Sequence, residues 1–277
     1  MKIEELRRKA NELRKITLNM CVGAGTGHVT SSFSCVEILT SLYLGGILRY
    51  NSNNPLWEDR DRFILSKGQA SPILYTTLAE AGFFPKEWLD TFCKENAHFG
   101  VHLQCDIPGV EFTTGSLGHG LGLGCGMALA AKQNRKDHFV FVVLGDAELY
   151  EGSNWEAAMF ASHNRLNNLI AIVDRNWLGV IDYTERALEL EPLEDKWKSF
   201  GWEVKRINGN SIKEIIDALY DFRSYKRNKP YVIIADTVKG CGSTCLQHIP
   251  LLHGAAPKEE VAEEIKEELN KVCFYDG

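Results

Sequence analysis

Two polar side chains follow two apolar runs of the sequence, at the point where each run ends. The run at residues 139–144 leads to Asp146, and the run at residues 169–173 leads to Asn176. Because the carboxyl ends of neighbouring parallel strands meet at one edge of a sheet, these side chains are expected to reach the same point. A carboxylate, an amide oxygen and a nearby backbone carbonyl suit Mg²⁺ or Ca²⁺. The alternative is that Asp146 and Asn176 are ordinary strand-end residues in turns.

The elements that position these side chains follow from the hydrophobic pattern. Continuous apolar runs, typical of strands buried on both faces, occur at residues 63–65, 139–144, 169–173, 202–204 and 231–235. Helices are predicted over residues 3–20, 36–42, 70–81, 86–95, 118–134, 153–165, 192–200 and 211–224, with a charged surface helix over 257–271. This alternation predicts an α/β fold, a doubly wound parallel sheet flanked by helices. We expect a single domain over 1–277, with 257–277 a C-terminal helical tail.

Composition and charge exclude several classes of protein. The chain has 277 residues, a formal net charge of −6 and 44% hydrophobic residues, which is ordinary globular composition. It has no apolar run of the ~18 residues that span a membrane and no basic cluster, so neither a membrane nor a nucleic acid is an expected partner. Eight cysteines without C-x-x-C spacing and no secretory signal predict reduced thiols in a cytoplasmic protein. A phosphorylated ligand would need a cation or local backbone donors.

Several segments resemble, in order, the motifs of the transketolase family. Gly145-Asp-Ala-Glu-Leu-Tyr-Glu-Gly152, followed by Asn176, is similar to the family's thiamine diphosphate and magnesium motif, normally Gly-Asp-Gly and then Asn. Further resembling segments lie at residues 26–28, 61–68, 108–118, 190–197, 237–240 and 253–254. The resemblance runs from about residue 10 to residue 260. It implies the thiamine diphosphate-binding fold and thiamine diphosphate as cofactor.

The resemblance also implies which residues bind the cofactor and the metal. Asp146, Asn176 and the carbonyl of Leu178 would bind Mg²⁺, with Ca²⁺ as a substitute. The N–H of Ala147 would donate to the diphosphate, which requires a negative φ at a position where the family has glycine. The other implied cofactor-binding residues are Gln69, His102, Gly115, Ser116, Leu117 and Glu151. Glu151 matches a carboxylate that joins two active sites across the dimer in family members.

Three histidines match family positions that line the cofactor and the reacting carbons of the substrate. His28, His102 and His253 are therefore implied as catalytic residues. Polarising a ketose carbonyl and moving hydroxyl protons suits imidazole, which titrates near neutrality. Taken alone, each histidine would more often be an ordinary surface or core residue than a catalytic one.

The motifs depart from the family pattern around one pocket. The family's Ser-x-Gly-His is Ser66-Lys-Gly-Gln69 here, and Gln can donate a hydrogen bond but cannot carry a proton charge. Leu-Gly-Gln becomes Leu117-Gly-His119, and Gly-His-Pro-Gly becomes Gly27-His-Val-Thr30. These changes indicate an unusual substrate or reduced activity and not a different cofactor.

The resemblance further implies a partner. Family members activate the cofactor with a glutamate on a second, pyrimidine-binding domain, and no segment after residue 260 is long enough to be that domain. We therefore expect the N-terminal subunit of a split transketolase that transfers a two-carbon ketol unit from a ketose to an aldose, acting on sugars or sugar phosphates. It would need a separate C-terminal subunit carrying the activating glutamate, in an α2β2 assembly.

Two other readings of this resemblance stay open. One is a subunit of a related enzyme, such as a 1-deoxyxylulose-5-phosphate synthase or an enzyme of modified-sugar ketol transfer. The other is a scaffold subunit without catalytic activity. No strand runs into a G-x-G-x-x-G turn, so a plain nucleotide-binding domain lacks support.

Overall fold

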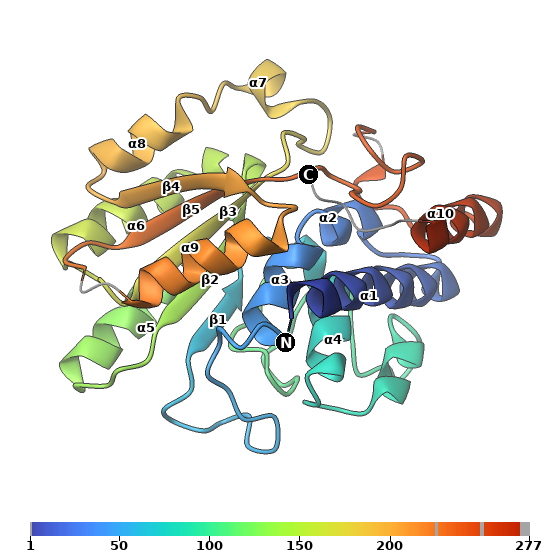
Figure 1. Ribbon diagram of the computed structural model, residues 1–277, viewed down its shortest axis with the longest axis horizontal. Helices are drawn as coiled ribbons and strands as arrows, with labels where there is room; N and C mark the ends of the chain where they lie inside the picture. Colours follow the sequence, from blue (N-terminus) through green and yellow to red (C-terminus); the bar gives the residue numbers. More distant parts are fainter. Residues whose placement is uncertain (1, 225–226, 250–251, 272–277) are drawn as a thin grey trace.

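The centre of the fold is a five-stranded parallel sheet with helices on both faces (Figure 1). The computed structural model describes residues 2–224, 227–249 and 252–271. The strands, in spatial order, are β1 (Arg62–Leu65), β2 (Val140–Gly145), β3 (Leu169–Arg175), β5 (Tyr231–Asp236) and β4 (Glu203–Asn208). All four pairings are parallel. The predicted α/β fold with a doubly wound parallel sheet is confirmed.

Alternate side chains of each central strand enter two separate cores. In β2, Phe141 and Val143 pack into the core beneath one layer of helices, whereas Val140, Val142 and Leu144 pack into the other. Every residue of β2 and β3 is buried, which explains why their sequences read as continuous apolar runs.

The helices divide between the two faces. The helices that contribute to the first core are α1 (Ile3–Ala24), α2 (Val29–Phe33), α3 (Val36–Tyr43), α4 (Ser71–Glu80), α9 (Ile212–Ser224) and α10 (Glu259–Lys271). Those of the second core are α5 (Gly120–Gln133), α6 (Gly152–His163) and α8 (Leu193–Ser199). Short helical turns complete the fold: η1 (Gly68–Ala70), η2 (Lys86–Thr91), η3 (Ala147–Tyr150) and α7 (Thr184–Ala187).

The predicted helix over 86–95 is wrong in type and length. Residues 86–91 form the 3-10 helix η2, and the chain then turns because Cys93 and Asn96 adopt left-handed backbone conformations with φ of 54° and 58°. The glycine-rich helix predicted over 118–134 begins at Gly120, since Gly118 has a φ of 83°. The strand predicted over 202–204 is the longer edge strand β4.

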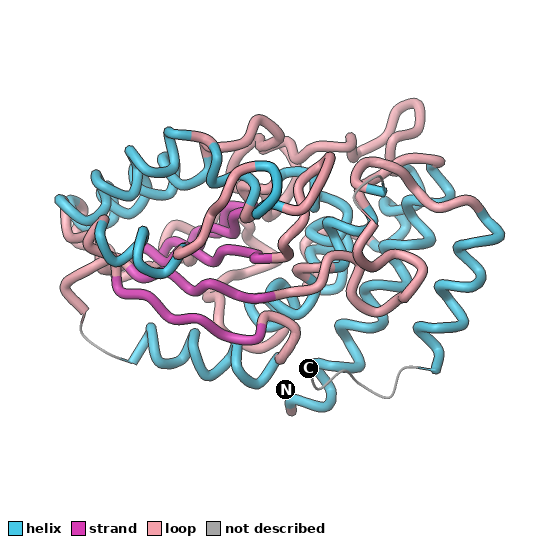
Figure 2. Tube along the Cα trace, turned by 90° about the horizontal axis from the view of Figure 1, so that it is seen from above, coloured by secondary structure: helices cyan, strands magenta, loops and turns pink. Residues whose placement is uncertain are grey.

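Loops that follow the strands gather beside one end of the sheet, as Figure 2 shows. Among the described residues, no helix is both long and apolar enough to cross a membrane. Seven cysteines in the described part of the chain are free thiols, as expected, and Cys273 lies outside the described residues.

Candidate active site

A cavity of about 60 Å³ lies at the carboxyl ends of β2 and β3. Its lining residues are Ser31, Lys67, Gln69, Leu117, Gly145, Asp146, Ala147, Glu148, Asn176, Leu178, Gly179, Val180, Lys239 and His253. Pockets that enclose a whole small-molecule ligand measure about 300–1,000 Å³. A ligand the size of a diphosphate cofactor would therefore occupy this cavity with one end only and extend beyond it.

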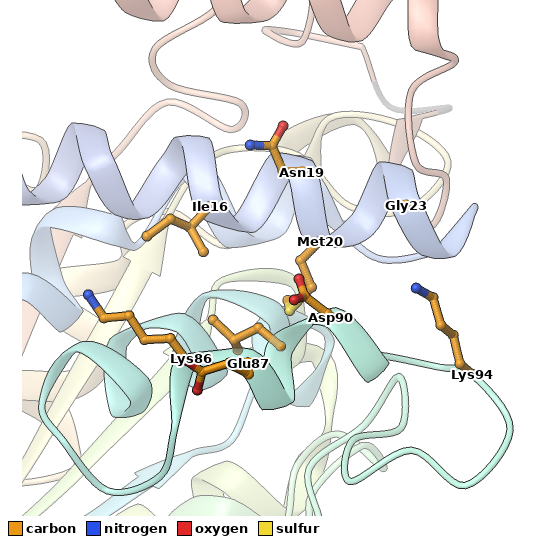
Figure 3. A pocket seen from close by; sticks show the side chains of 9 residues that line it. Ile16, Asn19, Met20, Gly23, Lys86, Glu87, Asp90 and Lys94 are labelled. Atoms are coloured by element: carbon orange, nitrogen blue, oxygen red, sulfur yellow. The ribbon is translucent and has the colours of Figure 1, made fainter.

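A larger cavity lies elsewhere, between α1 and η2. Its volume is about 420 Å³, and Lys86, Glu87, Asp90 and Lys94 line it opposite Ile16 and Met20 of α1 (Figure 3). The four charged residues here are exposed, and Lys86 is ion-paired with Glu80 at 2.5 Å. We take the smaller cavity as the candidate site, because buried polar groups from several strand ends converge there.

Asp146 and Asn176 line the same cavity because β2 and β3 are neighbours in the sheet, with Gly145 opposite Asp174. The Oδ1 of Asp146 accepts the N–H of Ala147 at 2.8 Å, and the side chain of Asp146 is almost wholly buried. The Oδ1 of Asn176 accepts the N–H of Leu178 at 3.2 Å. Burial raises the pKa of the Asp146 carboxyl, although Arg175 opposes this. An added cation would favour the ionised form of this carboxylate.

Lys67 is a buried cation of the cavity that the sequence analysis did not identify. Its ammonium pairs with Asp174 and donates to the carbonyl of Ser31 at 3.0 Å and to the Oγ of Ser34 at 3.2 Å. Asp174 is also held by the hydroxyls of Ser34, at 2.6 Å, and of Thr237. Burial alone would lower the pKa of Lys67, but Asp174 raises it above its ordinary value. Lys67 is therefore charged at neutral pH.

Lys239 is the second cation that the sequence analysis missed. Its Nζ donates to the carbonyls of Leu178 and Gly179 at 3.3 and 3.1 Å, and it lies 3.0 Å from the Nδ1 of His253. Burial, followed by the charge of Lys67, lowers its pKa to about 8. The sequence carried two signals for these lysines: each follows a predicted strand, 63–65 or 231–235, and each lies inside a family-like segment, 61–68 or 237–240. A phosphorylated ligand would thus meet protein cations here as well as any metal.

The three predicted histidines lie next to one another. The ring of His28 is 5.3 Å from that of His253 and 6.1 Å from that of His102, between centroids. Burial, then His102 and Lys239, lowers the pKa of His28 to about 4, and burial, then Lys239, lowers that of His253 to about 3. Without a bound ligand, both pKa values therefore lie below the range near neutrality that the sequence suggested. Both are neutral at pH 7.

Two side-chain atoms at this place are buried and, among the described residues, have no hydrogen-bond partner. They are the Nδ1 of His28 and the Oε1 of Gln69. Buried polar groups are normally hydrogen-bonded, so these two atoms are available to a ligand, a partner or a water molecule. Gln69 lines the cavity, at the position where the family pattern has histidine.

The remaining predicted residues differ in their relation to the cavity. Leu117 lines it, Ser116 is exposed, and Gly115 packs so closely on His102 that a Cβ would lie 3.0 Å from the ring. Glu151 is exposed at the N-cap of α6 and is not part of the lining. The buried carboxylate is instead Glu148, which accepts the N–H groups of Gly118 and Gly145, each at 3.0 Å.

Ala147 has the negative φ that donation of its N–H to a diphosphate requires. It begins the 3-10 helix η3 and is not among the residues with positive φ. Its N–H lies 2.8 Å from the Oδ1 of Asp146, so a diphosphate oxygen would have to share or displace that hydrogen bond.

Comparison with known proteins places this geometry in a family. The family described as "Transketolase, thiamine diphosphate binding domain" matches residues 6–273. An apulose-4-phosphate transketolase subunit of Phocaeicola vulgatus is 38% identical, over 98% of both chains. A 6-deoxy-6-sulfo-D-fructose transketolase subunit of Clostridium sp. is 39% identical, over 96% of this chain and 97% of that one.

Full-length transketolases match with only part of their own chains. Human transketolase is 38% identical over 97% of this chain but 42% of its own length. The crystal structure of Campylobacter jejuni transketolase superposes with a TM-score of 0.92 at 32% identity, over 100% of this chain and 45% of that one. These matches confirm the resemblance found in the sequence. The chain belongs to the transketolase family: it corresponds to the family's thiamine diphosphate-binding domain and to the N-terminal subunit of split transketolases.

Proposed function

We propose that this chain is the N-terminal subunit of a two-subunit transketolase that depends on thiamine diphosphate and Mg²⁺. It transfers a two-carbon ketol unit from a ketose to an aldose. The observation that carries this proposal is the convergence of Asp146, Asn176 and Leu178 in one cavity, in a chain that matches separately encoded transketolase subunits along almost its whole length.

The residues present fit a Mg²⁺ ion bound to a diphosphate. The Oδ1 of Asp146 accepts one described hydrogen bond, which leaves lone-pair capacity for a cation. The Oδ1 of Asn176 and the carbonyl of Leu178 also accept one described hydrogen bond each, from the N–H of Leu178 and the ammonium of Lys239. Together the three groups would supply the all-oxygen set that Mg²⁺ prefers, and Mg²⁺ usually completes its coordination with water and phosphate. Lys67 and Lys239 supply the positive charge that a −6 chain lacks overall.

Thiamine diphosphate, when bound, supplies the stabilised carbanion chemistry that cleaves and forms the bond next to a carbonyl. The chain's own residues bind, orient and handle protons around it. His28 and His253 are neutral, so each can accept a proton or a hydrogen bond from a sugar hydroxyl, His28 at its free Nδ1. The nearby charges of Lys67 and Lys239 suppress protonation of these rings. An anionic ligand that offsets the lysines would raise both pKa values toward the useful range.

A separate C-terminal subunit completes the active site in this proposal. Full-length transketolases are more than twice as long as the part that this chain matches, and the cavity holds only one end of a cofactor. We propose that the partner carries the activating glutamate, that two copies of each subunit form an α2β2 assembly, and that Glu151, exposed on α6, contributes to contacts across it. The aminopyrimidine ring of the cofactor is held by Gly115, Ser116 and Leu117. The assembly works in the cytoplasm.

Ketol transfer involving a modified sugar is the second candidate within the same chemistry. It is supported by Gln69, which replaces the family's histidine at the cavity. Two of the relatives are named as an apulose-4-phosphate transketolase subunit and a 6-deoxy-6-sulfo-D-fructose transketolase subunit, which supports a modified sugar as substrate. Synthesis of a 1-deoxyxylulose phosphate is a further alternative within the family chemistry.

The proposal is tested by co-purifying this chain with its candidate C-terminal subunit. Thiamine diphosphate binding is measured with and without Mg²⁺, and phosphorylated, sulfonated and unmodified ketoses are then screened as donors. We expect Mg²⁺-dependent binding and turnover of at least one donor. Absence of cofactor binding in the complex would refute the enzyme proposal and favour a role as a scaffold.

A further inference from the structure

Arg175 is a wholly buried arginine at the last position of β3, directly before Asn176. Its Nη1 donates to the Oδ2 of Asp146 at 3.1 Å and to the Oγ1 of Thr184 at 2.7 Å. On its other side the guanidinium meets Glu185 at 2.6 Å and Glu191 at 3.3 Å. A buried guanidinium is tolerated only when it is paired, and this one is shared among three carboxylates. It therefore ties the end of β2 to residues 184–191.

Trp177 stands between the two proposed metal-binding residues of the β3 turn in a conformation that tryptophan rarely adopts. Its φ is 67°, in the left-handed region that favours glycine. Strained backbone of this kind persists only where surrounding contacts hold it. Here the N–H of Trp177 donates to the Oδ2 of Asp146 at 2.7 Å, and its carbonyl accepts the N–H of Thr184 at 2.9 Å.

The indole ring of Trp177 is held by two arginines. The Cζ of Arg175 lies 3.7 Å from the ring centroid, and the Cζ of Arg206 lies 5.7 Å from it. Both arginines also pair with Glu191, and Arg206 pairs with Asp236 at the end of β5. The ring is thus tied to groups on three strands. Two groups donate to the same carboxylate oxygen, the Oδ2 of Asp146: the Arg175 guanidinium beneath the ring and the backbone N–H of Trp177.

We propose that Arg175 and Trp177 are positioning residues that hold the Asp146 carboxylate and the turn from Asn176 to Leu178 in one arrangement, ready for a divalent cation. This inference rests on the proposed function. The Oδ2 atom is engaged by these two residues, and the Oδ1 atom has capacity left for the ion. Glu185 and Glu191 pair with Arg175 and offset part of its charge, which reduces its repulsion of a cation at Asp146.

The sharpest variant is Trp177→Gly. Replacing Arg175 outright would leave three carboxylates without their shared cation and would put folding itself at risk. Glycine accommodates the positive φ and keeps the backbone N–H, so Trp177→Gly removes the ring without straining the turn, although it also frees the backbone. Trp177→Phe keeps an aromatic face for Arg175 and serves as the conservative variant. Arg186→Met, in an exposed side chain of the same segment, is the matched control.

The test is calorimetric titration of Mg²⁺ into the assembled complex with thiamine diphosphate present, together with the melting temperature of each variant. We expect Trp177→Gly to weaken Mg²⁺ binding by about tenfold or more, the usual effect of losing a group that orients a metal ligand. Trp177→Phe should recover most of this loss, and Arg186→Met should bind as the native chain does. Hydrogen exchange at the amides of residues 177–184 should be faster in Trp177→Gly.

Two results would overturn the inference. If Trp177→Gly folds and binds Mg²⁺ as tightly as the native chain, the ring does not position the ligands, while the proposed function stands. If the native complex itself binds neither Mg²⁺ nor thiamine diphosphate, the proposed function fails, and the positioning role fails with it.

Discussion

Replacing Lys67 by methionine should destabilise the fold through the charge that it leaves behind. The ammonium of Lys67 and the carboxylate of Asp174 form a buried ion pair, with 6% and 0% of their side chains exposed. Removing one member of such a pair costs about 3–5 kcal/mol, because the remaining charge stays buried without its partner. Ser34 and Thr237 continue to donate to Asp174, so we expect the lower part of this range.

The assay is urea unfolding of the Lys67→Met chain beside the native chain. Urea unfolding measures the loss of free energy of unfolding directly. For a domain of this size, a loss of 3–5 kcal/mol also corresponds to a fall in melting temperature of about 5–9 °C. The double variant Lys67→Met, Asp174→Asn removes both charges and should regain more than half of the lost free energy of unfolding. Lys86→Met is the control, since its exposed pair with Glu80 is worth at most about 1 kcal/mol.

Two outcomes would refute this reasoning. A loss below about 1 kcal/mol in Lys67→Met would mean that the pair is solvated and not buried. A double variant as unstable as the single one would mean that Lys67 stabilises the fold through its contacts with Ser31 and Ser34 and not through Asp174.

Three further predictions concern the cavity. Asp146→Asn should weaken Mg²⁺ binding, measured by calorimetry, by more than the ~10–100-fold that groups outside the coordination sphere contribute. The control Asp182→Asn, in the neighbouring segment, should leave Mg²⁺ binding unchanged. An Asp146→Asn variant that binds Mg²⁺ as tightly as the native chain would contradict the metal assignment. The pKa values of about 4 for His28 and about 3 for His253 lie below the value of about 6.5 in an unfolded chain. Between these values the unfolded chain binds more protons than the folded one. The free energy of unfolding should therefore fall as the pH drops from about 7 to 4. In urea unfolding, the double variant His28→Gln, His253→Gln should flatten this dependence of the free energy of unfolding on pH, and the exposed control His163→Gln should not. An unchanged slope with pH in the double variant would contradict the pKa assignment. Gln69→His should change the ratio of kcat/KM values between modified and ordinary ketose donors, and an unchanged ratio would mean that Gln69 does not set specificity.

Much of the fold could be predicted from the sequence, because the strands of the sheet centre are buried on both sides. Such strands read as continuous apolar runs whatever surrounds them, which is why β2 and β3 were predicted to within two residues. The helix predicted over residues 86–95 was wrong for a local reason. Its apolar spacing is helical, but the left-handed conformations of Cys93 and Asn96 depend on tertiary packing and leave no mark in the spacing.

The candidate site was predictable only where strand ends carried the signal. Asp146 and Asn176 follow two adjacent strands, so topology alone brings them together. Lys67 and Lys239 also follow strands, β1 and β5, which flank β2 and β3 in the sheet, so the same strand-end signal could have identified them. The low pKa values of His28 and His253 could not be foreseen either, since they follow from burial and from these two lysines.

The most direct test of the central claim is a titration in which this chain, at fixed concentration with Mg²⁺ and thiamine diphosphate in excess, receives increasing amounts of the C-terminal partner. The initial rate of ketol transfer from a turned-over ketose to an aldose is followed. The account predicts no turnover by either protein alone and a rate that rises to a plateau at one partner per chain. Turnover by this chain alone, or none at any ratio with any donor, would contradict it.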